Sequence, residues 1–181
     1  MGYESSYKVE SSYNVVRNYK VDQAEHAVRA YYLARELNRR KAVVSFPHFL
    51  DYTDPNYSRQ WFHTLIAEKC QDLLLGRLPT GRLMVFVGPQ HGKSEIVSRK
   101  FPAWALGYNP RLKIVGTSYA ASLAQGFSRS IQRTIDSLEY KEVFPATFLN
   151  SQNVSTDAKR GYLRNIDIFE TVGYGGFYRA V

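Results

Sequence analysis

The sequence predicts an α/β fold in which a parallel β-sheet is flanked by helices. Residues 83–87 form a short, uninterrupted apolar run, which is typical of a strand buried on both faces of a parallel sheet. A glycine-containing loop and a helical segment follow this run, and a second strand and a second helix follow them. Strands that alternate with helices in this order are the signature of βαβ units.

Composition favours a packed protein with an anionic partner. The chain has 181 residues, of which 44% are hydrophobic and 22% charged, so a core can form and wholesale disorder is disfavoured. Its 24 Lys and Arg against 16 Asp and Glu give a net charge of +8, which favours nucleic acid as a partner without deciding the matter. The single cysteine, Cys70, excludes an internal disulfide and suits a cytosolic location. No uncharged stretch is long enough to cross a membrane.

A polar arm followed by a helix is predicted at the N-terminus. Residues 1–20 are polar and rich in Tyr and Ser, so we expect a poorly ordered arm. A helix is predicted from Asp22 to Arg40, with Asp22 and Glu25 as a capping box. Its apolar face comprises Ala24, Ala27, Val28, Tyr31, Ala34 and Leu37.

A second helix is predicted over 58–75, and Gly76 stands where a C-terminal cap belongs. His63 lies between apolar positions of this helix and is interpreted as a polar residue at the edge of the core rather than as a metal ligand. The buried stripe comprises Trp61, Phe62, Leu65, Ile66, Cys70, Leu73 and Leu74.

Further elements follow the glycine-containing loop. A helix is predicted over 93–100, and Pro102 is expected to break it. The next strand is predicted over 111–117 and an amphipathic helix over 119–138. The stripe of that helix comprises Leu123, Phe127, Ile131, Ile135 and Leu138.

A β-hairpin is predicted at the C-terminal end. Residues 166–171 and 177–181 form its strands, and the glycine-rich segment 173–176 forms its turn. Because the second strand is still running at Val181, we expect the chain to be part of a longer protein.

The loop after the first strand has the parts of a P-loop, which indicates a P-loop NTPase core with ATP and Mg²⁺ as cofactors. Its glycines allow the backbone N–H groups to surround a phosphate, and the positive end of the following helix points at the anion. Lys93, the candidate catalytic residue, would reach the β- and γ-phosphates, and the Ser94 hydroxyl would bind Mg²⁺. The candidate cofactor-binding residues are Gly88, Pro89, Gln90, His91, Gly92, Lys93, Ser94 and Glu95.

The spacing of this loop is irregular. Only three residues separate Gly88 from Gly92, where a regular P-loop has four, and Val87 stands at the usual glycine position. The preceding apolar run and the following helix nevertheless supply the context that the motif requires.

Several segments together closely resemble the ATPase domain of the large terminase subunit of tailed bacteriophages, in which the shortened loop is normal. The resemblance covers about three quarters of the chain. It rests on the loop 88–94 and on Ser98-Arg99-Lys100-Phe101-Pro102-Ala103-Trp104, Thr117-Ser118-Tyr119-Ala120, Leu123-Ala124, Phe127-Ser128-Arg129, Glu139-Tyr140 and Val143-Phe144-Pro145. Many relatives carry an arginine where this chain has Gln90, so Gln90 does not supply an arginine finger.

This resemblance implies an ATP-driven motor that threads double-stranded DNA into a procapsid. The expected partners are double-stranded DNA, the portal protein, a small terminase subunit and further copies of the chain in a ring, all in the host cytoplasm and without a membrane. The expected division is a polar arm (1–20), a helical region (21–80) and the first part of the ATPase core (81–181). No apolar run ends in the adjacent carboxylates of a Walker B strand, and the family's nuclease domain is absent. The chain is therefore expected to bind ATP better than it hydrolyses it.

Two sets of residues have a functional and a structural interpretation. Phe46, Pro47, Phe49 and Trp61 would lie on the adenine side of the nucleotide or simply pack in the core. The other set comprises Ser118, Tyr119 and Arg129, which would couple nucleotide state to DNA or contact phosphates, or else cap a helix and lie on its solvated face.

Two alternatives remain open, of which the second belongs to a different class of function. One is a helicase-like P-loop ATPase that acts on DNA or RNA. The other is a nucleotide-binding module without turnover.

Overall fold

The computed structural model describes residues 4–154 and 161–181, with side chains described from Gln23 onward. The chain divides by its internal contacts into two units, one ending at Asn38 and the other covering Arg39–Val181. In the described residues, no helix is long and apolar enough to cross a membrane.

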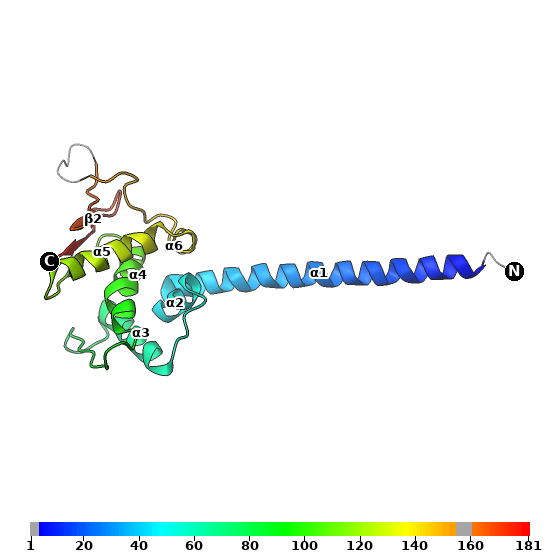
Figure 1. Cartoon of the computed structure of the whole chain (residues 1–181), viewed down its shortest axis with the longest axis horizontal. Coiled ribbons are helices and arrows are strands. Elements are labelled where there is room, and N and C mark those ends of the chain that lie inside the picture. The colour runs from blue at the N-terminus through cyan, green and yellow to red at the C-terminus, as the bar shows by residue number, and fades with distance from the viewer. Residues whose placement is uncertain (1–3, 155–160) are drawn as a thin grey trace. The chain divides into compact units, whose positions relative to one another are not determined.

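The N-terminal helix, α1 (Glu4–Val44), is much longer than predicted (Figure 1). The predicted start and capping box at Asp22 are wrong, because Asp22 lies inside the helix, and the predicted arm is helical from Glu4. No Gly or Pro interrupts residues 4–44, so nothing in this stretch ends the helix. Every residue of its predicted apolar face is exposed.

Two helices, α2 (Phe46–Thr53) and α3 (Trp61–Leu74), precede the loop 88–94 in the chain. The predicted C-terminal cap of α3 is confirmed: Gly76 has a φ of 67°, and the N–H of Arg77 donates to the carbonyl of Asp72 at 2.8 Å. The predicted stripe is only partly buried. Ile66 and Cys70 lie in the core, whereas Trp61 and Leu65 are exposed.

Aromatic side chains fill the core of the second unit. Phe46 packs against Trp104, and Phe49 packs against Tyr140 and Phe144. The two polar atoms buried with these rings have partners: Trp104 Nε1 donates to the carbonyl of Ala42 at 3.1 Å, and the Tyr140 hydroxyl donates to that of Ala103 at 3.0 Å.

The helix after the loop is continuous across Pro102, so the predicted break at this residue is wrong. A π-helical segment (Glu95–Lys100) runs directly into α4 (Phe101–Tyr108). The N–H of Phe101 reaches back five residues to the carbonyl of Ile96. This wider turn lies directly before the proline, whose ring would clash with a carbonyl in a regular α-helix.

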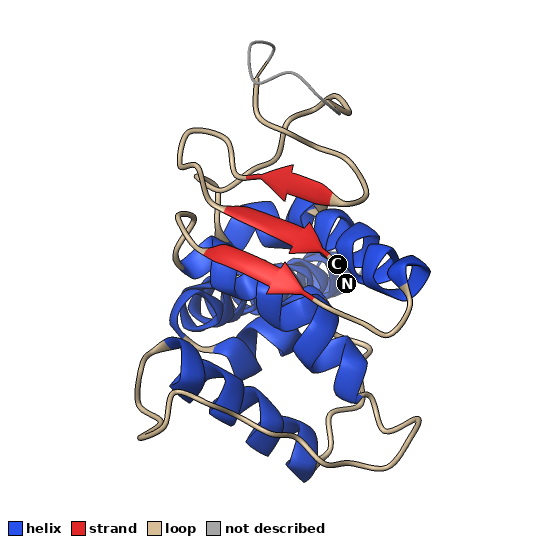
Figure 2. Cartoon of the chain, turned by 90° about the vertical axis from the view of Figure 1, so that its left-hand side faces the viewer, coloured by secondary structure: helices blue, strands red, loops and turns tan. Residues whose placement is uncertain are grey.

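The sheet has three strands in the order β1-β3-β2 (Figure 2). β1 (Lys113–Gly116) pairs in parallel with β3 (Phe177–Ala180), and β2 (Ile168–Glu170) pairs with β3 in antiparallel fashion. The predicted strand over 111–117 and the predicted hairpin are therefore confirmed.

Helices α5 (Ala121–Asp136) and α6 (Leu138–Val143) connect β1 to the hairpin. Ile131 and Ile135 of the predicted α5 stripe are buried, whereas Leu138 is exposed and begins the next helix. The Ser137 side chain accepts a hydrogen bond from the N–H of Tyr140, which caps α6 and separates it from α5.

The apolar run before the loop, residues 83–87, is not a strand of this sheet. Leu83, Val85 and Val87 are half-buried against the core, while Met84 and Phe86 are 81% and 88% exposed. Within the described part of the chain, no backbone–backbone hydrogen bond joins this run to another segment. The prediction of a strand buried on both faces is therefore wrong.

Candidate nucleotide-binding site

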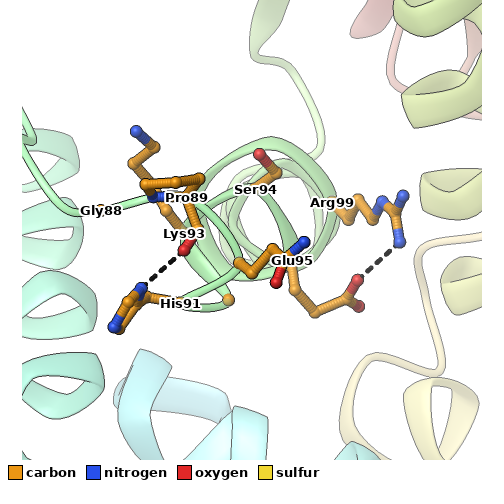
Figure 3. A pocket seen from close by; sticks show the side chains of 9 residues that line it. Gly88, Pro89, His91, Lys93, Ser94, Glu95 and Arg99 are labelled. Carbon is orange, nitrogen blue, oxygen red and sulfur yellow. Dashed lines mark hydrogen bonds and ion pairs between the residues drawn. The ribbon is translucent and has the colours of Figure 1, made fainter.

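The loop 88–94 lines a cavity. This cavity lies at the start of the continuous helix formed by the π-helical segment Glu95–Lys100 and α4. Gly92 adopts a φ of 70° and Gln90 one of 63°, so the loop turns through two left-handed residues. The positive φ is costly for a non-glycine residue such as Gln90. The cavity has a volume of about 350 Å³ and is lined by Gly88, Pro89, Gln90, His91, Gly92, Lys93, Ser94, Glu95 and Arg99 (Figure 3).

Three backbone N–H groups at the start of this helix are free to bind an anion. The first helical hydrogen bond runs from the N–H of Ile96 to the carbonyl of Gly92 at 3.2 Å. Within the described part of the chain, the N–H groups of Lys93, Ser94 and Glu95 have no hydrogen-bond partner. Free N–H groups at a helix N-terminus are the common backbone element of phosphate sites.

Two cations line the cavity. Lys93 Nζ donates to the carbonyl of Val87 at 3.4 Å, a long hydrogen bond that the ammonium can give up to a stronger acceptor. Arg99, which was not among the predicted site residues, pairs with Glu95 four residues earlier at 2.8 Å. Its guanidinium also lies 5.8 Å from the centre of the Phe127 ring, and its Nε is buried without a partner in the described structure.

The side chain of His91 folds back onto the loop. Its Nδ1 lies 2.7 Å from the carbonyl oxygen of Pro89, and the carbonyl oxygen of His91 lies 3.0 Å from Nε2 of His63 in α3. Figure 3 shows His91 on one side of the helix start and the Glu95–Arg99 pair on the other. The contact between His63 and the loop could not be predicted from sequence spacing, because it forms only when the folded chain brings α3 beside the loop.

The four predicted adenine-side residues separate into two groups. Phe46, Pro47 and Phe49 are buried in the core, so contact with a base would require the core to open. Trp61 is 77% exposed and packs edge-on against Phe62, whose ring centre lies 6.0 Å from that of His91. Trp61 is therefore the member of this set that a base can reach.

The structure does not bring Ser118, Tyr119 or Arg129 into the cavity lining. The N–H of Ser118 donates to the carbonyl of Val181 at 3.1 Å, which extends the pairing of β1 and β3. The interpretation of Ser118 as a helix cap is wrong, because the N-cap of α5 is Ala120. Tyr119 and Arg129 are exposed.

The candidate ligand for magnesium at the loop is a single side chain, that of Ser94. Among the side chains that the structure describes, in residues 23–154 and 161–181, no group of three or more His, Cys, Asp or Glu is placed to hold a metal ion. Magnesium that accompanies a nucleotide takes most of its ligands from water and phosphate oxygens, so one protein hydroxyl suffices. The exposed hydroxyl of Ser94 can be that ligand.

Comparison with known proteins adds no further constraint: no family model matches the chain, and neither a curated protein nor a solved structure is significantly similar to it.

Proposed function

We propose that this chain binds Mg–ATP at the loop 88–94 and forms part of the ATPase motor of a viral large terminase, which moves double-stranded DNA into a procapsid. The observation that carries the proposal is the cavity at the helix start. Lys93, Ser94 and Glu95 line this cavity, and their backbone N–H groups have no hydrogen-bond partner in the described part of the chain. Backbone donors and a cation in this arrangement suit the β- and γ-phosphates of a nucleotide.

The base of the nucleotide would lie toward Trp61. Trp61 and Phe62 form an aromatic surface that leads from the exposed end of α3 to His91 in the loop. An exposed indole ring offers a stacking face at little cost, because no core contact has to break.

The motor assignment rests on the resemblance of the loop and its flanking segments to large terminases. The net charge of +8 suits a protein that contacts a DNA backbone. In this proposal, the portal protein, a small terminase subunit and further copies of the chain are the partners, and the host cytoplasm is the location. A helicase-like ATPase shares the same core and is the alternative within the enzyme class.

One observation favours the second alternative, a module that binds nucleotide without efficient turnover. Glu95 is the only carboxylate that lines the cavity in the described structure, and it is paired with Arg99. Hydrolysis requires a group that positions the attacking water, and a carboxylate held by an arginine is poorly suited to this task. We therefore expect binding to exceed turnover.

Phosphate release from ATP, measured with and without double-stranded DNA, tests the proposal. DNA-stimulated release that Lys93→Ala reduces at least about 100-fold would support a motor, because removing one preorganised transition-state donor costs about 10²–10³ in rate. Nucleotide binding without release would support the binding module. Release that is equal for wild type and Lys93→Ala would exclude both.

A further inference from the structure

The side chain of His63 joins the first turn of α3 to the phosphate-binding loop. Its Nδ1 lies 3.1 Å from the backbone nitrogen of Gln60, and its Nε2 lies 3.0 Å from the carbonyl oxygen of His91. The backbone N–H of His63 also donates to the carbonyl of Gln60 at 3.0 Å, so ring and backbone both hold the first turn of α3. One ring therefore bridges two segments that are 28 residues apart.

These two hydrogen bonds define the tautomer of the ring. A backbone N–H can only donate, so Nδ1 of His63 is the acceptor in the bond from Gln60. A carbonyl oxygen can only accept, so Nε2 carries the proton and donates to His91. The neutral Nε2–H ring satisfies both partners at once.

The ring is held tightly in place. His63 is buried, and its ring centre lies 4.1 Å from that of Phe62 and 5.4 Å from that of Tyr57. On the loop side, a Cβ atom at Gly92 would lie 2.7 Å from the Tyr57 hydroxyl and 3.1 Å from His63 Nε2. The glycine backbone therefore lies directly against these two side chains, and its positive φ excludes most other residues.

We propose that His63 is a positioning residue for the phosphate-binding loop. The C=O and N–H of a trans peptide point in opposite directions, so holding the His91 carbonyl toward α3 makes the Gly92 N–H point away from α3. In that orientation the Gly92 N–H can donate to a phosphate in the cavity that Gly92 lines. The inference rests on the proposed function, and the ligand it concerns is the phosphate chain of a nucleoside triphosphate.

Two substitutions separate the contact with the loop from the contact with the helix cap. His63→Gln places an amide N–H₂ near the position of Nε2 and can still donate to His91, but it loses the acceptor for Gln60. His63→Asn keeps an acceptor near the position of Nδ1, but it does not reach His91. His48→Asn is the matched control, because His48 is exposed and its hydrogen bond with Ser45 is local.

The experiment measures the Kd of a fluorescent N-methylanthraniloyl ATP with Mg²⁺, with circular dichroism and Tm recorded for each variant. We expect His63→Asn to weaken binding about 10- to 100-fold, the range that follows from leaving one buried polar group unpaired. We expect His63→Gln to stay within about threefold of wild type and His48→Asn to equal it. Equal affinity for wild type and His63→Asn, or equal losses for Gln and Asn, would overturn the inference.

A second measurement covers the case in which His63→Asn fails to fold. The ¹⁵N shifts of the imidazole ring in the wild-type protein report the tautomer directly. We expect the neutral Nε2–H form, and a Nδ1–H or charged ring would overturn the inference. If the wild-type protein does not bind the nucleotide while the His63 ring has the expected tautomer, the proposed function fails and the hydrogen bonds of His63 stand. If the wild-type protein binds the nucleotide and His63→Asn binds it equally well, only the positioning role of His63 fails.

Discussion

The carboxylate of Glu95 lies 2.8 Å from the guanidinium of Arg99, and both side chains line the cavity at the loop. The pair is partly exposed and so contributes little to stability. It places one negative charge beside a space whose lysine and arginine side chains, Lys93 and Arg99, favour an anion. Neutralising Glu95 therefore changes the electrostatics of the cavity more than it changes the fold.

Glu95→Gln is expected to lower the Kd for ATP by about two- to fivefold, because it removes a like charge from the anion site and frees Arg99. Titration at low and at high salt measures the effect, which should shrink as salt rises. Glu139→Gln in α6 is the control, since Glu139 does not line the cavity. Weaker binding by Glu95→Gln would show that Glu95 itself contacts the bound magnesium or the nucleotide.

Tryptophan fluorescence is expected to report nucleotide binding through Trp61 alone. The chain has two tryptophans, of which Trp61 is exposed and Trp104 is completely buried. Trp61→Phe should give blue-shifted emission that acrylamide quenches poorly, and nucleotide should no longer change it. Trp104→Phe should keep the nucleotide response if it folds. A response that persists in Trp61→Phe would place the base away from α3.

Gly176→Ala is expected to destabilise the protein strongly, by more than about 2 kcal/mol. The added Cβ would lie 2.2 Å from the carbonyl oxygen of Pro110 and 2.7 Å from that of Leu112, and backbone atoms cannot move aside as a flexible side chain does. Gly126→Ala in α5 is the control. Its Cβ meets nothing within 4 Å, so the helix should gain about 0.5–1 kcal/mol. Urea unfolding of both variants measures the difference, and a neutral Gly176→Ala would contradict the packing described.

Stability is expected to decline above about pH 9. Burial raises the pKa of the Cys70 thiol from 9.0 to about 12. Burial also raises the pKa values of the Tyr140 and Tyr178 hydroxyls. A raised folded-state pKa means that the unfolded state ionises first, so stability is complete below the unfolded value and is lost as the pH rises toward the folded value.

For Cys70 this window runs from pH 9.0 to about 12, with a loss of up to about 1.4 kcal/mol per pH unit. Urea unfolding at pH 7, 8, 9 and 10 measures the decline, and Cys70→Ser, which does not ionise, should flatten part of it. Constant stability from pH 7 to 10 in the wild type would contradict the burial of these groups.

The local patterns of the sequence predicted many of the elements. The hairpin of β2 and β3, the cap at Gly76 and the amphipathic α5 each depend on residues close together in the chain. Short-range turn chemistry and hydrophobic periodicity suffice for such features.

Features that depend on tertiary contacts could not be predicted in this way. An uninterrupted apolar run such as 83–87 indicates a buried strand only if other strands lie on both sides of it, and the described residues supply none. Pro102 normally ends a helix, but a wide π-helical turn before it keeps the helix continuous. Periodicity also cannot show that α3 turns Trp61 and Leu65 toward solvent.

In the candidate site, too, some features follow from local sequence and others depend on tertiary contacts. Residues 88–95 could be named as candidates from the sequence, because they are consecutive and their types suit the binding of a phosphate, and the structure shows that they line one cavity. The i,i+4 spacing of Glu95 and Arg99 was a signal that could have added Arg99 to the set. No pattern in the sequence indicates the contact between His63 and His91, because it forms only when α3 packs beside the loop.

Isothermal titration calorimetry of Mg–ATP into the wild-type protein and into Lys93→Ala tests the central claim most directly. The account predicts saturable binding at one site by the wild type and a loss of affinity of at least about tenfold in Lys93→Ala, with unchanged circular dichroism. Wild-type protein that gives no binding heat at any temperature between 10 and 30 °C, or a Lys93→Ala variant that binds as tightly as the wild type, would contradict it.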